Sequence, residues 1–444
     1  MKLDHGRRMS GLFPFAAAAM SVAVLVPSVA AGPAQSVSRR SDPVSRWIDH
    51  HARALRTTDP HAPLGDLKPL RKQLRGATIA GLGEAVHGAR QITGLKMRAT
   101  RLLVERMGFR TLAWEDAWTT GYRINRYLRT GAGNPVKLVG QMTGQWQSRQ
   151  TVDTLRWLRQ FNTGRCDKVT FFGVEYYYTG RLAYDAVEEY VAGSAPSHLS
   201  TLLNHLGPIR PTVPNAATYA QRYAKVCDKA PYIRHARHVY RLIRGLPHRG
   251  DDRAHAVALH HARQILSFHE HYALQINDQN IYREVHVAQN IRWWQRLSGD
   301  RVAYWAATPH TANAPSMRIG LPGGAEFRFP SSGYHLGRWY NDSYVSVGFT
   351  FDHGTVGLRP GKPFKMTAPK PHWFERRLAQ QHRAHFVLDV DRPAPPPVRS
   401  WLHGPLTTRG LPQAGPTSTI SGGSVTQWFD AVVHTQRVHP LDAL

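Results

Sequence analysis

Residues 81–88, GLGEAVHG, hold a carboxylate, Glu84, and an imidazole, His87, three positions apart among small residues. A histidine whose pKa lies near neutrality can take a proton from water, and a neighbouring carboxylate can orient the ring and stabilise the imidazolium. Taken alone, the segment fits equally well a turn between a strand and a helix, with the glutamate at the helix N-terminus. Its chemistry therefore depends on what the fold places beside it.

Three further polar residues follow predicted strands: Glu115, Glu175 and His310. The loops at the carboxyl ends of parallel strands converge on one edge of the sheet, so we expect these residues to meet Glu84 and His87 there. A well-placed base contributes about 10²- to 10⁴-fold to a rate. A second carboxyl group such as Glu115 would protonate a departing alkoxide. The chain has no G-x-S-x-G nucleophile elbow, which favours activation of water over attack by a serine.

Apolar periodicity predicts the elements that position these residues. A buried strand at 76–84, a helix at 89–109 and a strand at 110–118 make one βαβ unit, which is typical of a parallel sheet. Helices are expected at 45–56, from about 67, and at 151–162. The remaining strands are expected at 168–177, 301–308, 344–351, 384–390 and 428–435. The prediction is an α/β fold with a mostly parallel central sheet flanked by helices, and a largely helical additional region at about 181–294.

The N-terminus has the layout of a secretory signal peptide. Basic residues precede the apolar stretch 12–31, and its small terminal residues suit cleavage near Ala30 or Ala31. We expect residues 1–31 to be this signal, 32–44 a flexible lead-in, and the protein to be secreted or extracytoplasmic. General secretion, the twin-arginine route and an uncleaved anchor all stay open.

The chain is strongly basic, with 57 Lys and Arg against 30 Asp and Glu and a formal charge of +27. Such a field attracts anions in general. Lysine-rich runs, zinc-finger spacing and RNA-binding aromatic signatures are missing from the sequence, so we expect no specific nucleic acid partner. An electrostatic association with an anionic cell wall stays open, because arginines spread along the whole chain also arise from coding bias.

Cysteines and histidines give no metal prediction. Cys166 and Cys227 are too few for a structural zinc site, and whether they form a disulfide stays open. The segment 260–271 carries four histidines but no H-E-x-x-H motif, and His269 and His271 point to different sides of a helix. We therefore predict neither a metal nor another cofactor.

The segment 81–115 resembles the erythromycin esterase family, whose hallmark is G-E-x-x-H-G, then a helix with a basic residue, then a strand ending in glutamate. Further segments match in the same order: WLRQFN, FFGVE, REVHVAQNIRWW, WAATPH, GYHLGRWYNDSYVSVGFTF and WFDAVV. The resemblance spans roughly residues 45–441. It implies one α/β domain with helical additions and a metal-independent hydrolase that opens macrolide lactones or cleaves a related small-molecule ester.

The resemblance also implies roles for individual residues. His87 resembles the general base that activates water, Glu84 its acidic partner and Glu115 the second carboxylate of the active site. His310 matches the second histidine of the family's W-A-H-N-x-H segment, and we expect it to take part in catalysis.

Three more residues are expected to bind substrate or stabilise charge. Lys96 occupies the place of the family's basic residue, and Arg283 resembles the arginine of R-D-x-x-M-A-E-N. Glu175 stands where family members usually have the aspartate of G-x-D. Glu284 and Gln289 depart from the arginine segment.

The largest departure is in WAATPH, where Ala307 replaces the first histidine and Thr308 the asparagine. This leaves three functions open. The first is an ester or lactone hydrolase. The second is a cyclase, dehydratase or acyl-transfer enzyme of natural-product metabolism that uses the same site. The third is a cell-wall-binding protein that has lost catalysis.

Overall fold

The computed structural model describes residues 42–248, 252–357, 363–415 and 417–444. The expected signal peptide, its cleavage site and most of the lead-in lie outside these residues. None of the described helices combines the length and the apolar character needed to cross a membrane.

A nine-stranded sheet forms the centre of the fold, with the order β1-β10-β13-β8-β2-β5-β3-β4 and with β9 paired to β8. The five adjacent pairs from β13 to β4 are parallel, whereas β1, β9 and β10 pair antiparallel. The predicted mostly parallel sheet is therefore confirmed. Its strands are β1 (Arg53–Ala54), β2 (Ile79–Glu84), β3 (Phe109–Ala117), β4 (Thr170–Glu175), β5 (Arg301–Ala307), β8 (Tyr344–Gly357), β9 (Pro363–Met366), β10 (His385–Asp389) and β13 (Ala431–Val438).

Helices cover both faces of this sheet, which is why its strands read as continuous apolar runs. In β5, Trp305 packs with Leu103 in one core, whereas its neighbour Tyr304 packs with Ile291 in another, because successive side chains point to opposite faces. The helices up to β4 are α1 (Pro43–His51), α2 (Lys68–Gln73), α3 (Arg90–Met107), α4 (Trp118–Thr130), α5 (Pro135–Val139) and α6 (Arg149–Asn162). Short 3-10 helices occur at Gly65–Leu67 and, as η2, at Gly144–Trp146.

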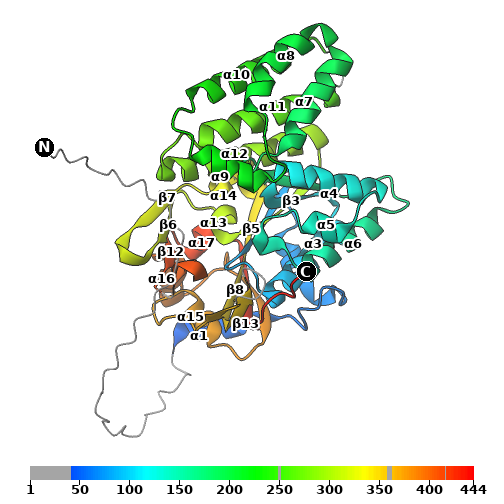
Figure 1. The fold of residues 1–444 in the computed structure, drawn as a ribbon. Coiled ribbons are helices and arrows are strands. Elements are labelled where there is room, and N and C mark those ends of the chain that lie inside the picture. Colours follow the sequence, from blue (N-terminus) through cyan, green and yellow to red (C-terminus); the bar gives the residue numbers. More distant parts are fainter. Residues whose placement is uncertain (1–41, 249–251, 358–362, 416) are drawn as a thin grey trace, which may run out of the picture. The chain divides into compact units, whose positions relative to one another are not determined.

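The segment predicted to be mostly helical is helical in the structure. Its helices are α7 (Arg181–Ser194), α8 (Leu199–Leu206), α9 (Ala216–Ala224), α10 (Ala230–Gly245), α11 (Arg253–His271) and α12 (Ile276–Ser298), with 3-10 turns at Pro196–His198 and Gly207–Ile209. Helices α7, α8, α10 and α11 bury an apolar cluster of their own, around Val187, Val239 and Ile265. In Figure 1 they form the green group at the top, and α12 leads from it back to the sheet.

A second, antiparallel sheet of four strands was not anticipated from the sequence. It has the order β11-β12-β6-β7, and its strands are β6 (Met317–Gly320), β7 (Glu326–Phe329), β11 (Thr407–Arg409) and β12 (Thr419–Ser421). These strands are three or four residues long and lie between Pro- and Gly-rich turns, so they carry little periodicity. The accompanying helices are α13 (Thr308–Thr311), α14 (Ser332–Tyr340), α15 (Glu375–Ala379), α16 (Pro396–His403) and α17 (Val425–Trp428), with 3-10 turns at Pro322–Gly324, Asn341–Ser343 and Pro412–Ala414.

Several element boundaries differ from the predictions, and the widest difference is in β8, which continues past the predicted end at 351 to Gly357. Helix α1 ends at His51 rather than Arg56, because the following residues pair with β10 as β1. The last strand begins at Ala431, after a short helix that the side chain of Ser424 caps. The cysteines, left open by the sequence, are both exposed free thiols.

Candidate active site

Four neighbouring strands deliver the predicted site residues to one edge of the sheet. In the order β2, β5, β3 and β4, the first ends at Glu84, the second at Ala307 and the fourth at Glu175, while Glu115 lies near the end of β3. His310 follows in α13, immediately after β5. The expected convergence at the carboxyl ends of parallel strands is therefore present in the structure.

The carboxylate of Glu84 holds the ring of His87. Nδ1 of His87 lies 2.8 Å from Oε1 of Glu84, so Nδ1–H donates to the carboxylate and Nε2 keeps its lone pair. The edge of the ring packs against Trp146, with 4.8 Å between the ring centroids. The side chain of His87 is 21% exposed, compared with 4% for Glu84. The free nitrogen of an oriented imidazole is thus accessible from solvent.

Lys96 lies behind Glu84, on the first half of α3. Its ammonium group forms an ion pair with the second oxygen of Glu84, donates to the carbonyl of Ala306 (3.3 Å) and lies 4.6 Å from the centre of the Trp305 ring. The side chain is 1% exposed. In this position Lys96 supplies the counter-charge of Glu84 from inside the protein.

Glu115 is the centre of the cluster. Its Oε2 accepts the backbone N–H of Ala307 at 2.8 Å and lies 3.9 Å from Nε2 of His87. Its Oε1 lies 3.2 Å from Nε2 of His310 and 3.1 Å from Nη2 of Arg283. One buried carboxylate therefore faces both histidines and a guanidinium.

Arg283 reaches this carboxylate from α12. Its guanidinium joins Glu115 to Glu175 at the end of β4, where Nε donates to Oε1 of Glu175 at 3.0 Å. It also lies over the ring of Tyr177, 5.2 Å from the ring centre. Glu175 is fully buried, so its contact with the rest of the cluster runs through Arg283.

Glu284, which the sequence marked only as a departure from the family segment, belongs to the site. Its Oε1 accepts Nδ1–H of His310 at 2.7 Å, and its Oε2 accepts the N–H and hydroxyl of Ser332 at 2.8 and 2.7 Å. His310 is thus held between two carboxylates, those of Glu284 and Glu115. The spacing of Glu284 with Val287 and Ile291 on one helix face was a signal that this carboxylate is buried.

Trp146 is a second residue that sequence reasoning missed. Besides packing on His87, its indole N–H donates to the backbone carbonyl of Glu115 at 2.7 Å. It is the last residue of the short 3-10 helix η2, where neither periodicity nor a motif marks it.

The charges of the cluster give the two histidines opposite protonation states. Burial lowers the pKa of His87 below its ordinary value of 6.5, and the carboxylate of Glu115 offsets only part of this effect. Burial also lowers the pKa of His310, but the carboxylates of Glu284 and Glu115 outweigh it and raise the pKa to about 10. At neutral pH, His87 is therefore a neutral base and His310 a cation.

The same charges argue against Glu115 as the proton donor expected from the sequence. Burial raises its pKa, but His310, His87 and Arg283 outweigh burial and hold the pKa well below its ordinary value. Glu115 is consequently a carboxylate that accepts hydrogen bonds, and the protonated member of the cluster is His310.

The histidines of α11 have structural partners. His269 and His271 lie 3.2 and 3.1 Å from the hydroxyls of Tyr184 and Tyr176. In the described part of the chain, no three His, Cys, Asp or Glu side chains gather as they would around a metal ion.

Comparison with known proteins shows that the chain matches one protein family over most of its length. A family model described as erythromycin esterase matches residues 104–438. The erythromycin esterase type II of Escherichia coli is 26% identical over 129 residues, which are 29% of this chain and 30% of that protein. The sequence alignment thus covers less than a third of this curated relative.

Solved structures share the fold over almost the whole chain. A Bacillus cereus protein superposes with a TM-score of 0.80 at 24% identity, over 90% of this chain and 98% of its own. An erythromycin esterase mutant in its open conformation superposes with a TM-score of 0.66 at 16% identity, over 88% of this chain and 99% of its own.

Proposed function

This chain belongs to the erythromycin esterase family, and from that premise we propose that it cleaves an ester or lactone with water that His87 activates. Family membership indicates a hydrolase of the ester or lactone type. The observation that carries the proposed mechanism is the orientation of His87, whose Nδ1 is bound by Glu84, while Nε2 makes no hydrogen bond within the described residues and the side chain is partly exposed.

In the first step, Nε2 of His87 takes a proton from water while the water oxygen attacks the carbonyl carbon of the substrate. Glu84 and Glu115 stabilise the imidazolium that forms, since their oxygens lie 2.8 and 3.9 Å from the ring nitrogens. Arg283 and protonated His310 both lie beside Glu115. Their positive charges stabilise the negative charge on the carbonyl oxygen.

In the second step, the bond between the carbonyl carbon and the alkoxy oxygen breaks. The imidazolium of His87 gives its proton to the departing alkoxide, so that an acid and an alcohol leave and the base is restored. Lys96 and Glu175 act through their ion pairs with Glu84 and Arg283, and position these groups for the reaction.

Ala307 widens the range of substrates that we propose. The backbone N–H of Ala307 still donates to Glu115. Its methyl side chain, however, replaces the imidazole that family members have at this position, next to Glu84 on the neighbouring strand. We therefore include esters and lactones other than macrolides.

We also propose that the protein is exported, and the signal-like residues 1–31 support this proposal. N-terminal sequencing of the mature protein is the test.

The test is a mass-spectrometric screen of macrolactones and simple esters in ¹⁸O-labelled water. Hydrolysis places one solvent oxygen in the product, whereas a cyclase or dehydratase does not. His87→Ala should lower kcat by at least about 10²-fold, with unchanged circular dichroism and Tm. His353→Ala is the matched control, because His353 also pairs with a carboxylate, that of Asp352 at 2.8 Å, but is exposed and outside the cluster.

Two results would overturn the proposal. One is turnover by His87→Ala at the rate of the unmodified protein, and the other is a product without solvent oxygen. Salt-sensitive adhesion to cell walls without turnover of any ester would instead favour the binding-protein alternative.

A further inference from the structure

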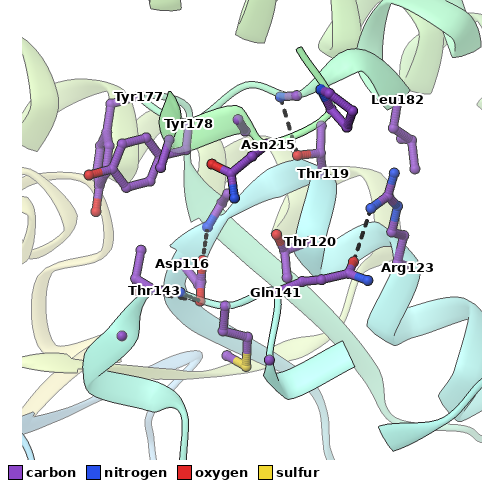
Figure 2. A pocket seen from close by; sticks show the side chains of 18 of the residues that line it. Asp116, Thr119, Thr120, Arg123, Gln141, Thr143, Tyr177, Tyr178, Leu182 and Asn215 are labelled. Atoms are coloured by element: carbon purple, nitrogen blue, oxygen red, sulfur yellow. Dashed lines mark hydrogen bonds between the residues drawn. The ribbon is translucent and has the colours of Figure 1, made fainter. Parts of the chain in front are cut away.

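A cavity of about 500 Å³ adjoins the catalytic cluster. Its walls come from four segments: the end of β3 with the start of α4, the segment 140–147, the residues after β4, and the N-terminus of α9. Figure 2 shows these segments enclosing a space into which polar side chains project. None of the catalytic side chains described above lines this cavity, so it lies beside the catalytic cluster and does not include it.

The lining is rich in groups that form hydrogen bonds. Hydroxyls, amides and a carboxylate come from Thr120, Gln145, Tyr178, Asn215 and Asp116. Within the described residues, the side chains of Thr120, Gln145 and Tyr178 make no hydrogen bond to protein. They are therefore available to a ligand. An apolar ligand would cover these polar groups without offering them a hydrogen bond, which is unfavourable.

Three residues connect this cavity to the catalytic cluster. Asp116, in its wall, directly follows Glu115, and the ring of Tyr177, also in its wall, packs against the guanidinium of Arg283. Trp146, which packs on His87, lies between two wall residues of the same segment, Gln145 and Gln147. A substrate bound in the cavity thus lies next to the groups proposed to cleave it.

We propose that this cavity binds a polyhydroxylated, sugar-like part of the substrate, adjacent to the ester bond at His87. A sugar ring presents several hydroxyls, each of which both donates and accepts, and these match amides, hydroxyls and a carboxylate better than any apolar group does. The tyrosine rings of the wall offer faces on which the C–H edges of such a ring pack. This inference rests on the proposed ester hydrolysis and narrows its substrate class.

The first experiment compares two acetate esters that share a six-membered ring with an acetoxymethyl group, one ring being a sugar and the other a hydrocarbon. These are a methyl 6-O-acetylglycoside and cyclohexylmethyl acetate, and kcat/KM is measured for both. We expect the sugar ester to be preferred by at least about tenfold. Thr120→Val and Gln145→Ala should each lower this preference severalfold. Gln73→Ala is the control, because Gln73 is a half-buried glutamine of α2 that lies outside the cavity and should leave the preference unchanged.

The second experiment separates failure of this inference from failure of the proposed function. Binding of a panel of methyl glycosides to His87→Ala is measured by saturation-transfer NMR, which needs no turnover. Binding that Thr120→Val and Gln145→Ala weaken supports the sugar-like ligand even if neither ester is cleaved. Equal kcat/KM for the two esters, or no glycoside binding to His87→Ala, overturns it.

Discussion

Glu284 accepts the Nδ1–H of His310 over 2.7 Å, and this contact fixes the charge of the second histidine in the cluster. Burial and the nearby Arg283 both lower the pKa of His310, whereas Glu284 and Glu115 raise it. With this contact, His310 remains protonated far above neutral pH and can stabilise an oxyanion. In the proposed mechanism, the positive charge that faces the carbonyl oxygen therefore depends on Glu284.

Glu284→Gln should reduce activity chiefly at alkaline pH. The amide oxygen can still accept Nδ1–H, but the negative charge is lost, so the pKa of His310 falls from about 10. A carboxylate in direct contact typically shifts a pKa by about 1 to 3 units. We thus expect the alkaline limb of kcat/KM to move toward neutral pH by about one pH unit or more.

Ser332→Ala is the control for this variant, since it removes one hydrogen bond from Glu284 and leaves its charge in place. Its alkaline limb should stay near that of the unmodified protein. An unchanged limb in Glu284→Gln would show that the charge of His310 is not needed for turnover.

The unmodified protein should show an acid limb of kcat/KM below pH 6.5. The base must be neutral to accept a proton. Burial holds the pKa of His87 below 6.5; His310 and Arg283 lower it further, and Glu115 offsets only part of this decrease. Activity therefore increases as pH rises through this pKa and is lost below it. A pH profile of kcat/KM measures the limb, and an acid limb clearly above 6.5 would contradict His87 as the base.

The sequence predicted where the carboxylates of the candidate site converge, because strand ends are easy to recognise. Glu84, Glu115 and Glu175 each follow an apolar run, and parallel topology then requires them to meet. What the sequence did not predict is which carboxylate contacts which cation. That depends on side chains from α12 and α13 that lie far apart along the chain, as in the pairing of Glu284 with His310.

The second sheet escaped prediction for a different reason. Its strands have three or four residues each and are brought together from segments about 80 to 100 residues apart, as in the pairing of Ile420 with Ile319. Such short strands show no clear alternation, so their partners, rather than their own sequence, determine their conformation. The long strand β8 shows the opposite case, since its apolar run was sufficient to predict the part at 344–351, although not its continuation to Gly357.

Lys96→Met should destabilise the protein, because it leaves Glu84 buried without its cation. Removal of one partner of a buried ion pair typically costs about 3–5 kcal/mol in the free energy of unfolding. The double variant Lys96→Met/Glu84→Gln removes both charges and should recover most of this stability. It should remain much less active, because the amide can still accept Nδ1–H of His87 but lacks the negative charge that stabilises the imidazolium.

Urea denaturation and kcat, measured on both variants, test this prediction. The double variant separates folding from catalysis, since stability returns while turnover does not. Normal stability of Lys96→Met would mean that the ion pair with Glu84 contributes little, and full activity of the double variant would mean that Glu84 does not support the base.

Gly173→Ala should damage the site through the backbone of β3. A Cβ at Gly173 would lie 2.2 Å from the carbonyl oxygen of Ala117, so one of the two strands must shift. The register of β3 against β4 is irregular between Trp114 and Ala117, and Glu115 lies in this irregular stretch. We expect a loss of about 1–3 kcal/mol in the free energy of unfolding. A displacement of Glu115 by about 1 Å would lower kcat/KM by about 10²-fold.

Gly193→Ala is the matched control for this substitution. Gly193 lies in the last turn of α7, where an added Cβ meets no atom within 4 Å, so alanine should stabilise the helix by up to about 1 kcal/mol. Its kcat/KM should equal that of the unmodified protein. Urea denaturation and steady-state kinetics on the two variants distinguish a local clash at β3 from a general effect of replacing glycine. If Gly173→Ala kept both stability and kcat/KM, the close approach of β3 and β4 would not be what positions Glu115.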